Sequence, residues 1–431
     1  MPADVTFRDS ELRSKPLLAV NRVGSVLRRA GIARPSLTPE SILAKARKKA
    51  RDAGQSLTSA VGTLSAEDAF GGDSYRAGLD HYLAAAEREA DLTTFGRILV
   101  STMLSGALAN RIRLHRWAEE HPEVRDERIE APWIIVGLPR TGTTLLSVLL
   151  GLDPQARPLL GWEADSPVPP PTLDGAAEDP RIATYAKGLE QLHRLNPALP
   201  AMHPMGATLA QECVALFMVD LRTVGLETQA LVPSYGRWLE DTDMAPAYAQ
   251  HTLALQTLQS RLPTERWVLK SPNHLWCLPT MLETYPDARV VWTHRAPGPV
   301  LTSLASLVNG IQRPLTERTD PRPVAEEWKA KIHRILARAT EFDATAPGGW
   351  CQHLQYEELL ADPVGAVRAL YAAHGEEVTP LHERRMRAWL EQRPQDVFGR
   401  HRYDPADFGW TYDGLADEFS DYVERFDVAT A

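Results

Sequence analysis

The stretch WIIVGLPRTGTTLLSVLLGLD, residues 133–153, decides the fold. It begins with a short apolar run rich in β-branched residues, which predicts a buried strand. It ends with TTLLSVLLGLD, which predicts a helix. The loop between them directs backbone N–H groups towards one point, and the helix dipole adds positive potential there. The stretch therefore predicts an anion-binding site at a strand-to-helix turn.

The loop lacks the lysine of a nucleotide-hydrolysing loop. Gly137 and Gly142 have the G-x-x-x-x-G spacing of such a loop, but Thr143 stands where the lysine is expected. Nucleotide hydrolases also use an acidic residue after a second strand to support magnesium. The candidate second strand ends in VVWTHR, without one. A magnesium-dependent phosphotransferase is therefore only the alternative interpretation, and Arg140 can bind an oxyanion through its planar guanidinium.

Apolar strands alternate with amphipathic helices along the rest of the chain. This alternation predicts an α/β fold, with a P-loop-type parallel sheet flanked by helices. Residues 75–120 repeat apolar residues at helical spacing. We therefore expect residues 1–130 to form an N-terminal helical extension packed on the core, and residues 131–431 to form the α/β domain. Further strands are predicted at 266–270, 288–295 and 350–356, and further helices at 273–285, 298–309 and 357–375.

Composition restricts the class of protein. The chain has 431 residues, of which 44% are apolar and 24% are charged, as in globular enzymes. Its net charge of −9 argues against nucleic acid as a partner. Cys213, Cys277 and Cys351 lie far apart, so we expect neither a disulfide framework nor a metal site. No leader or long apolar stretch is seen, which favours a cytoplasmic location.

The first 60 residues carry local positive charge, with 12 Lys or Arg against five Asp or Glu. The segment SILAKARKKARDAG, residues 41–54, predicts a basic helix. Its charge is that of a solvated helix face, or of a peripheral contact with an anionic membrane. The sequence indicates no oligomeric state.

The loop and four later segments resemble sulfotransferases that use 3′-phosphoadenosine 5′-phosphosulfate (PAPS). GLPRTGTT (137–144) resembles their 5′-phosphosulfate loop, and is most similar to those of the bacterial P-loop sulfotransferase-like group and the tyrosylprotein sulfotransferases. VLKSPNHL (268–275) resembles their Lys-Ser-Pro segment, and THRAPGPVLTS (293–303) resembles their 3′-phosphate motif. LQYEELLADP (354–363) and GRHRYDPADFGW (399–410) resemble two later blocks. The matches follow in order along the chain.

The resemblance implies that the chain transfers a sulfuryl group from PAPS to a hydroxyl, leaving adenosine 3′,5′-bisphosphate. It implies in-line transfer without a metal, with Lys270 and Arg140 stabilising charge on the leaving phosphate. A non-catalytic homologue is a further alternative, against which the retained cationic residues argue. The residues implied to bind PAPS are Pro139, Arg140, Thr141, Gly142, Thr143, Thr144, Arg295, Ser303, Tyr356, Gly399, Arg400 and His401.

The acceptor hydroxyl needs a proton acceptor. In tyrosylprotein sulfotransferases, a glutamate after the first helix of the motif serves as this base. Glu163 occupies that place here. In cytosolic sulfotransferases the base is a histidine, for which His203 is the nearest counterpart and His193 the next. Glu163 is the expected base and His203 the alternative. Glu212 is expected to shape the pocket or a helix N-terminus.

The acceptor is expected to be a small molecule, lipophilic or aromatic. Segments 155–265 and 310–320 are rich in Trp, Leu, Met and Pro and are expected to line its pocket. Each of these side chains can equally belong to the core. The side chains considered are Trp162, Met202, Met205, Phe217, Met218 and Trp238.

Overall fold

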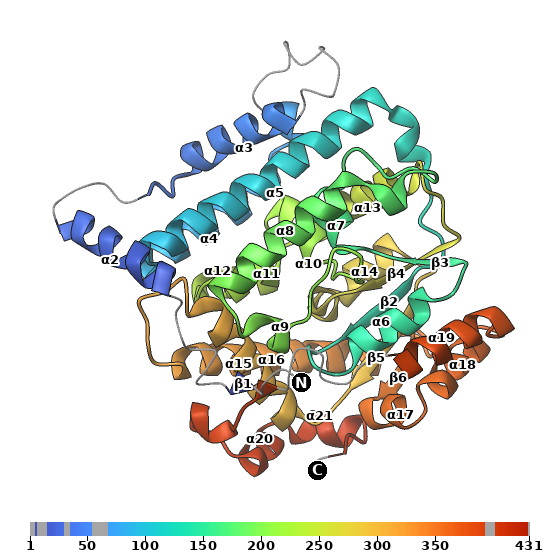
Figure 1. Ribbon diagram of the computed structural model, residues 1–431. Helices are drawn as coiled ribbons and strands as arrows, with labels where there is room; N and C mark the ends of the chain where they lie inside the picture. Colours follow the sequence, from blue (N-terminus) through green and yellow to red (C-terminus); the bar gives the residue numbers. More distant parts are fainter. Residues whose placement is uncertain (1–4, 7–14, 30–34, 54–67, 393–400, 430–431) are drawn as a thin grey trace.

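Within the described residues, a five-stranded parallel sheet forms the centre of the molecule (Figure 1). The computed structural model describes residues 5–6, 15–29, 35–53, 68–392 and 401–429. The strand order is β3-β4-β2-β5-β6, and every neighbouring pair is parallel. The strands are β2 (Trp133–Gly137), β3 (Ala156–Pro158), β4 (Arg266–Lys270), β5 (Arg289–His294) and β6 (Cys351–Gln355).

Successive side chains of the central strand pack against opposite helical layers, because side chains alternate along a strand. Trp133 and Ile135 of β2 belong to one apolar cluster, formed with α6 and α17–α19. Ile134 and Val136 belong to a larger cluster, formed with α5, α10 and α13–α16. Burial on both faces explains the continuous apolar run of this strand. The expected α/β fold is confirmed.

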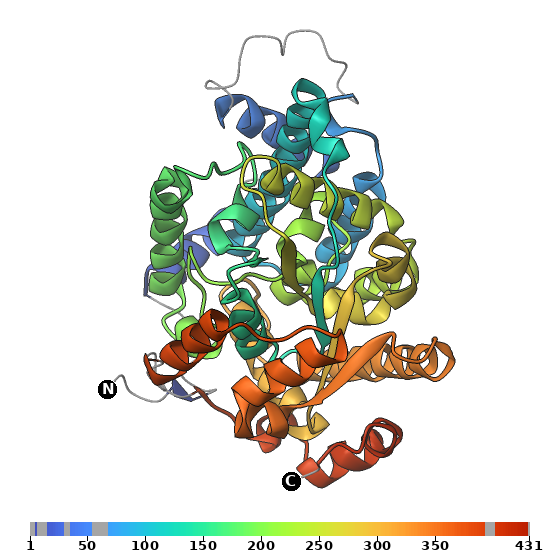
Figure 2. The same cartoon turned by 90° about the vertical axis from the view of Figure 1, so that its right-hand side faces the viewer.

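The helices surround this sheet, with the N-terminal helices at the end away from α17–α19 (Figures 1 and 2). Before the sheet lie α2 (Lys15–Arg29), α3 (Pro39–Ala53), α4 (Tyr75–Glu89) and α5 (Thr94–Glu120). Between the loop and β4 lie α6 (Thr143–Gly151), α7 (Gly161–Asp165), α8 (Pro180–Leu195), α9 (Leu199–Met202), α10 (Val214–Phe217), α11 (Val224–Gln229), α12 (Pro233–Asp241) and α13 (Ala245–Gln259). Later come α14 (Leu278–Thr284), α15 (Pro297–Gln312), α16 (Arg322–Thr345), α17 (Tyr356–Ala361), α18 (Pro363–Ala373), α19 (Pro380–Gln392), α20 (Tyr412–Glu418) and α21 (Ser420–Arg425).

The long helix α5 is tied to the rest of the protein by a buried ion pair. Arg111 and Asp220 lie 2.6 Å apart, with side chains 1% and 0% exposed. Breaking such a pair leaves an uncompensated buried charge and costs about 3–5 kcal/mol. The basic helix α3 packs along α5, where Lys45 donates to the Ser101 hydroxyl at 2.7 Å and Lys49 to a backbone carbonyl at 2.8 Å. Part of its charge therefore fastens it to α5.

Three local features differ from the sequence-based expectation. Strand β3 is not predicted, because three residues carry no apolar run. The helix predicted over 357–375 is divided into α17 and α18, because the Asp362 side chain accepts a hydrogen bond from the Gly365 amide at 2.9 Å and starts a new helix. Near the C-terminus, β7 (His401–Arg402) pairs in parallel with β1 (Val5–Thr6). None of the described helices is both long and apolar enough to cross a membrane.

Candidate active site

The loop after β2 has a backbone that only glycine tolerates at two positions. Gly137 and Gly142 have φ angles of 141° and 85°. A Cβ on Gly137 would lie 2.4 Å from the Thr293 hydroxyl oxygen, and one on Gly142 would lie 3.0 Å from Leu359. Gly142 is also the N-cap of α6 and supplies no side chain to its first amides. These amides are therefore free to bind an anion.

Inside the loop, the hydroxyl groups are divided between two tasks. Thr141 is fully buried, and its hydroxyl lies 2.7 Å from both the Leu138 carbonyl and the Thr293 hydroxyl. It holds the loop in shape. Thr143 and Thr144 instead line the cavity described below, together with Pro139 and Arg140. The expected role of Thr141 as a direct ligand thus receives no support from its position.

Arg140 joins the loop to α15. Its φ angle is 72°, a left-handed conformation that costs a non-glycine residue energy. Its Nε donates to the Ser303 hydroxyl at 3.0 Å, and Arg295 donates to its carbonyl at 2.8 Å. The Arg295 guanidinium lies over the Tyr356 ring, 4.1 Å from the centroid. Residues from three separate motifs therefore meet at one edge of the sheet.

The catalytic candidate Lys270 reaches the same edge because parallel strands end together. Ile135 of β2 is paired with Lys270 of β4, so the lysine lies beside the start of the loop. It is 3% exposed, and its Nζ donates to the Glu212 carboxylate at 3.0 Å. Burial by itself would raise the pKa of Glu212, but the positive charge of Lys270 and the hydrogen bond that Lys270 donates lower it overall. Glu212 is therefore an anion that holds Lys270.

His203 is a half-buried side chain at the same end of the cavity. Burial lowers its pKa from the ordinary 6.5; the charge of Glu212 opposes this, while Lys270 and Arg140 lower it further. In the part of the chain that the structure describes, its ring nitrogens have no hydrogen-bond partner. A neutral imidazole with a free nitrogen can accept a proton.

Glu163 does not line this cavity. Its side chain is 1% exposed, and one carboxylate oxygen lies 2.6 Å from Arg157. The other accepts a hydrogen bond from the Leu160 amide at 3.2 Å. The carboxylate thus holds the start of α7 and is paired with Arg157. Geometry does not favour Glu163 as the base, and places His203 and Glu212 at the cavity instead.

The cavity has a volume of about 510 Å³ and extends from the loop into a helical chamber. Its polar end contains Arg140, His203 and Glu212. Its apolar end is lined by side chains of α5, α11, α15 and α16. Among its apolar lining residues are Phe95, Leu99, Met103, Trp276, Ile311 and Ile332.

The expectation for the acceptor pocket is met only in part. Met205 and Met218 line the cavity. Trp162 and Phe217 are 1% and 0% exposed and belong to the core, as the alternative interpretation allows. The contribution of α5 was not expected, because an amphipathic pattern cannot distinguish a core face from a cavity wall. Gly399 and Arg400 lie outside the described residues, as does the side chain of His401.

The comparisons with known proteins agree with this arrangement. The profile of the sulfotransferase family matches residues 132–380. The omega-hydroxy-beta-dihydromenaquinone-9 sulfotransferase Stf3 of Mycobacterium bovis is 28% identical over 255 residues, which are 56% of this chain and 62% of that protein. This chain therefore matches less than two thirds of that relative. The Mycobacterium tuberculosis protein of the same name matches to the same extent.

Two solved structures share nearly the whole fold. Sulfotransferase STF1 from Mycobacterium tuberculosis is 30% identical, with a TM-score of 0.78 over 90% of this chain and 100% of that one. STF9 from Mycobacterium avium is 28% identical, with a TM-score of 0.80 over 91% of this chain and 98% of that one. The family match covers more than half of the sequence and includes the loop, Lys270 and Arg295. The chain belongs to the sulfotransferase family.

Proposed function

We propose that this enzyme transfers a sulfuryl group from PAPS to the hydroxyl of a lipophilic small molecule. The observation that carries the proposal is the continuity of one cavity, which joins an anion-binding loop to an apolar chamber. An anionic donor suits the loop, and an apolar acceptor suits the chamber. The named substrate of Stf3, a hydroxylated menaquinone derivative, is lipophilic too.

The residues at the loop fit a phosphosulfate donor. The loop backbone lies so close to Thr293 and Leu359 that a Cβ at Gly137 or Gly142 has no room, and this close packing fixes the shape of the loop. Arg140, Lys270 and the first amides of α6 would hold the 5′-phosphosulfate. Arg295 and Ser303 are both hydrogen-bonded to Arg140 and therefore lie close together. They would hold the 3′-phosphate. PAPS, when bound, supplies the activated sulfuryl group.

His203 is the proposed proton acceptor. As the acceptor oxygen forms its bond to sulfur, its proton passes to the free imidazole nitrogen of His203. The 5′-phosphate of PAPS, which Lys270 and Arg140 would hold, would leave with the electron pair of the broken bond between sulfur and the bridging oxygen. Lys270 and Arg140 stabilise this developing charge, which is the largest contribution that a protein makes to such a transfer. Glu212 keeps Lys270 in place.

The test is a direct assay of transfer. The purified protein is incubated with PAPS and a lipid extract, and products are analysed by mass spectrometry for a mass gain of one sulfuryl group. We expect adenosine 3′,5′-bisphosphate and a sulfated lipophilic alcohol to form together. Lys270→Ala serves as the inactive control. Sulfation confined to water-soluble metabolites would contradict the proposed acceptor class, and failure to use PAPS would contradict the donor.

A further inference from the structure

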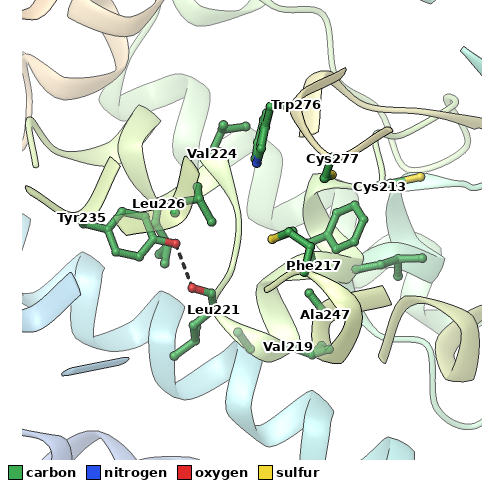
Figure 3. Packing of buried hydrophobic residues seen from close by; sticks show 14 of the residues in the cluster. Cys213, Phe217, Val219, Leu221, Val224, Leu226, Tyr235, Ala247, Trp276 and Cys277 are labelled. Atoms are coloured by element: carbon green, nitrogen blue, oxygen red, sulfur yellow. Dashed lines mark hydrogen bonds between the residues drawn. The ribbon is translucent and has the colours of Figure 1, made fainter. Parts of the chain in front are cut away.

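A cluster of potential metal ligands lies in the core behind Lys270. Cys213 precedes α10, His251 lies on α13, and His274 lies on the 3₁₀ helix Pro272–Trp276. One ligand atom from each residue lies within 4.8 Å of the others. All three side chains are 0% exposed. Figure 3 shows Cys213 in this core with Phe217 and Cys277 near it.

Tyrosine hydroxyl groups fix the orientation of both imidazoles. Nδ1 of His251 lies 2.7 Å from the Tyr285 hydroxyl, and Nδ1 of His274 lies 2.6 Å from the Tyr248 hydroxyl. Metal-bound histidines in proteins are held in this way, through the ring nitrogen that does not bind the metal.

Each tyrosine hydroxyl has a second partner to which it can donate. The Tyr285 hydroxyl lies 2.8 Å from the Thr252 hydroxyl, and the Tyr248 hydroxyl lies 3.6 Å from the Cys277 sulfur. Both tyrosines can therefore accept a hydrogen bond from an Nδ1–H group. A neutral imidazole that is protonated at Nδ1 carries a lone pair on Nε2. The network thus favours the tautomer that binds a metal through Nε2.

The Nε2 atoms are buried and unpaired. Among the described residues, neither His251 Nε2 nor His274 Nε2 has a hydrogen-bond partner. Buried polar atoms are nearly always paired, so two unpaired ones in a single cluster require an explanation. Ligand atoms that bond one ion at about 2.0–2.3 Å lie less than about 4.6 Å apart. A slight contraction of this cluster would bring all three atoms within bonding distance of one ion.

We propose that Cys213, His251 and His274 bind one thiophilic transition-metal ion, Zn²⁺ or Cu⁺, as a structural centre. Thiolate and imidazole are ligands that both ions prefer. Binding replaces the thiol proton of Cys213, which is released to solvent, and leaves the two imidazoles neutral. The centre has no part in sulfuryl transfer. It would instead join three elements of the core.

A second cysteine–histidine cluster provides an internal comparison. Ligand atoms of Asp343, Cys351 and His353 also lie within 4.8 Å of one another. Here, however, His353 is 2.9 Å from His294 on one side and 3.3 Å from Asp343 on the other. Asp343 also accepts hydrogen bonds from Trp350 and Arg425, at 3.0 and 2.9 Å. Its donors and acceptors are satisfied without a metal, so the proposal does not extend to it.

The proposed centre would also support the active site. The Cys213 amide donates to the Lys270 carbonyl at 2.9 Å, and the preceding residue Glu212 accepts a hydrogen bond from the Lys270 side chain. His274 follows Lys270 by four positions. A metal bound to Cys213 and His274 would hold together the two segments that position the lysine.

The experiment measures metal directly. The full chain is produced in cells supplied with Zn²⁺, and separately with Cu⁺, and its metal content is determined by mass spectrometry. We expect one equivalent of one metal in the wild type and in the matched control Cys351→Ala, and none in Cys213→Ala. The two growth conditions distinguish zinc from copper. A chelator should lower the Tm of the wild type but not that of Cys213→Ala.

A measurement on the wild type covers the case in which Cys213→Ala fails to fold. X-ray absorption of the bound metal should show one sulfur and two nitrogen ligands. After exchange for Co²⁺, a thiolate-to-cobalt charge-transfer band should appear in the near ultraviolet. The proposal is overturned if the wild type holds neither Zn²⁺ nor Cu⁺ in stoichiometric amount. It is equally overturned if the metal is lost from Cys351→Ala and kept by Cys213→Ala.

Discussion

The two ends of the cavity are built in different ways. The polar end is formed by short segments at strand ends. Hydrogen bonds join Thr141 to Thr293, and join Arg140 to both Ser303 and Arg295. At the apolar end the cavity wall consists mainly of apolar side chains from α5, α11, α15 and α16. The hydrogen bonds and ion pairs that join these helices, such as Lys331 to Glu227 at 2.9 Å, lie between the helices. Directional contacts restrict the residue type at each position, whereas apolar packing accepts many solutions. The donor end is therefore recognisable in a sequence, and the acceptor end is not.

The largest effect is expected from Lys270→Ala at the polar end. Loss of one preorganised cation at the leaving group should lower kcat about 100–1000-fold. The KM for the acceptor should change little, because the lysine does not line the apolar chamber. Steady-state kinetics with both substrates varied would measure this. The variant Lys48→Ala, at an exposed position of α3, is the control. An unchanged kcat in Lys270→Ala would remove Lys270 from the mechanism.

The second-largest effect is expected from His203→Ala. Its kcat should fall about 100-fold or more, as is usual when a general base is lost. The base acts unprotonated, and burial holds its pKa below 6.5. Activity of the wild type should therefore persist as the pH falls through 6.5 and decline only below it. The pH–rate profile measures this decline, which should disappear in His203→Ala. If His203→Ala keeps both the wild-type kcat and the decline in rate at low pH, His203 is not the base.

Arg295→Ala should chiefly weaken nucleotide binding. Hydrogen bonds to charged groups contribute about 1.5–3 kcal/mol, so the Kd for adenosine 3′,5′-bisphosphate should rise about 10–100-fold. Calorimetric titration would measure it. Arg295→Lys should recover part of the affinity, since it retains the charge. Normal binding in Arg295→Ala would refute its assignment to the 3′-phosphate.

The apolar end should respond differently, in acceptor selectivity alone. Met103→Trp fills part of the chamber and should raise the KM for a long-chain alcohol about tenfold, the scale of a poorly accommodated methylene group. A short-chain alcohol and PAPS should be affected little. Ile98→Trp is a matched control, because Ile98 lies on the same helix and is 46% exposed. Equal effects of the two substitutions would show that α5 does not line the acceptor site.

The smallest effect on kcat is expected from Glu163→Gln. This variant tests whether the role of Glu163 follows from its buried position or from the family resemblance. Its carboxylate is paired with Arg157 and 1% exposed. The substitution should lower the free energy of unfolding by about 3 kcal/mol, because Arg157 loses its buried partner. The kcat of the folded enzyme should stay near the wild-type value. Chemical denaturation would measure the free energy of unfolding, and active-site titration would give the kcat of the folded enzyme. A loss of turnover at unchanged stability would restore Glu163 as the base.

Most of the sheet and the donor end of the site could be predicted from the amino-acid pattern. Strands β2, β4 and β5 are largely apolar runs that local pattern reveals, and the positive φ angles at Gly137 and Gly142 are local requirements too. Lys270 and Arg295 could be expected near the loop because strands of a parallel sheet end at a common edge. These inferences rest on interactions between residues that are close along the chain, or on a general rule of topology.

Long-range packing determines which carboxylate reaches the cavity and which helices form its far wall. Glu163 follows the loop in sequence, but Arg157 holds it in the interior, while Glu212 reaches Lys270 across 58 positions. The cluster of Cys213, His251 and His274 is likewise spread over three elements and has no motif spacing. Such contacts depend on how separate helices and strands pack. Packing energies are spread over many weak, non-directional contacts, so they leave no pattern of spacing in the sequence.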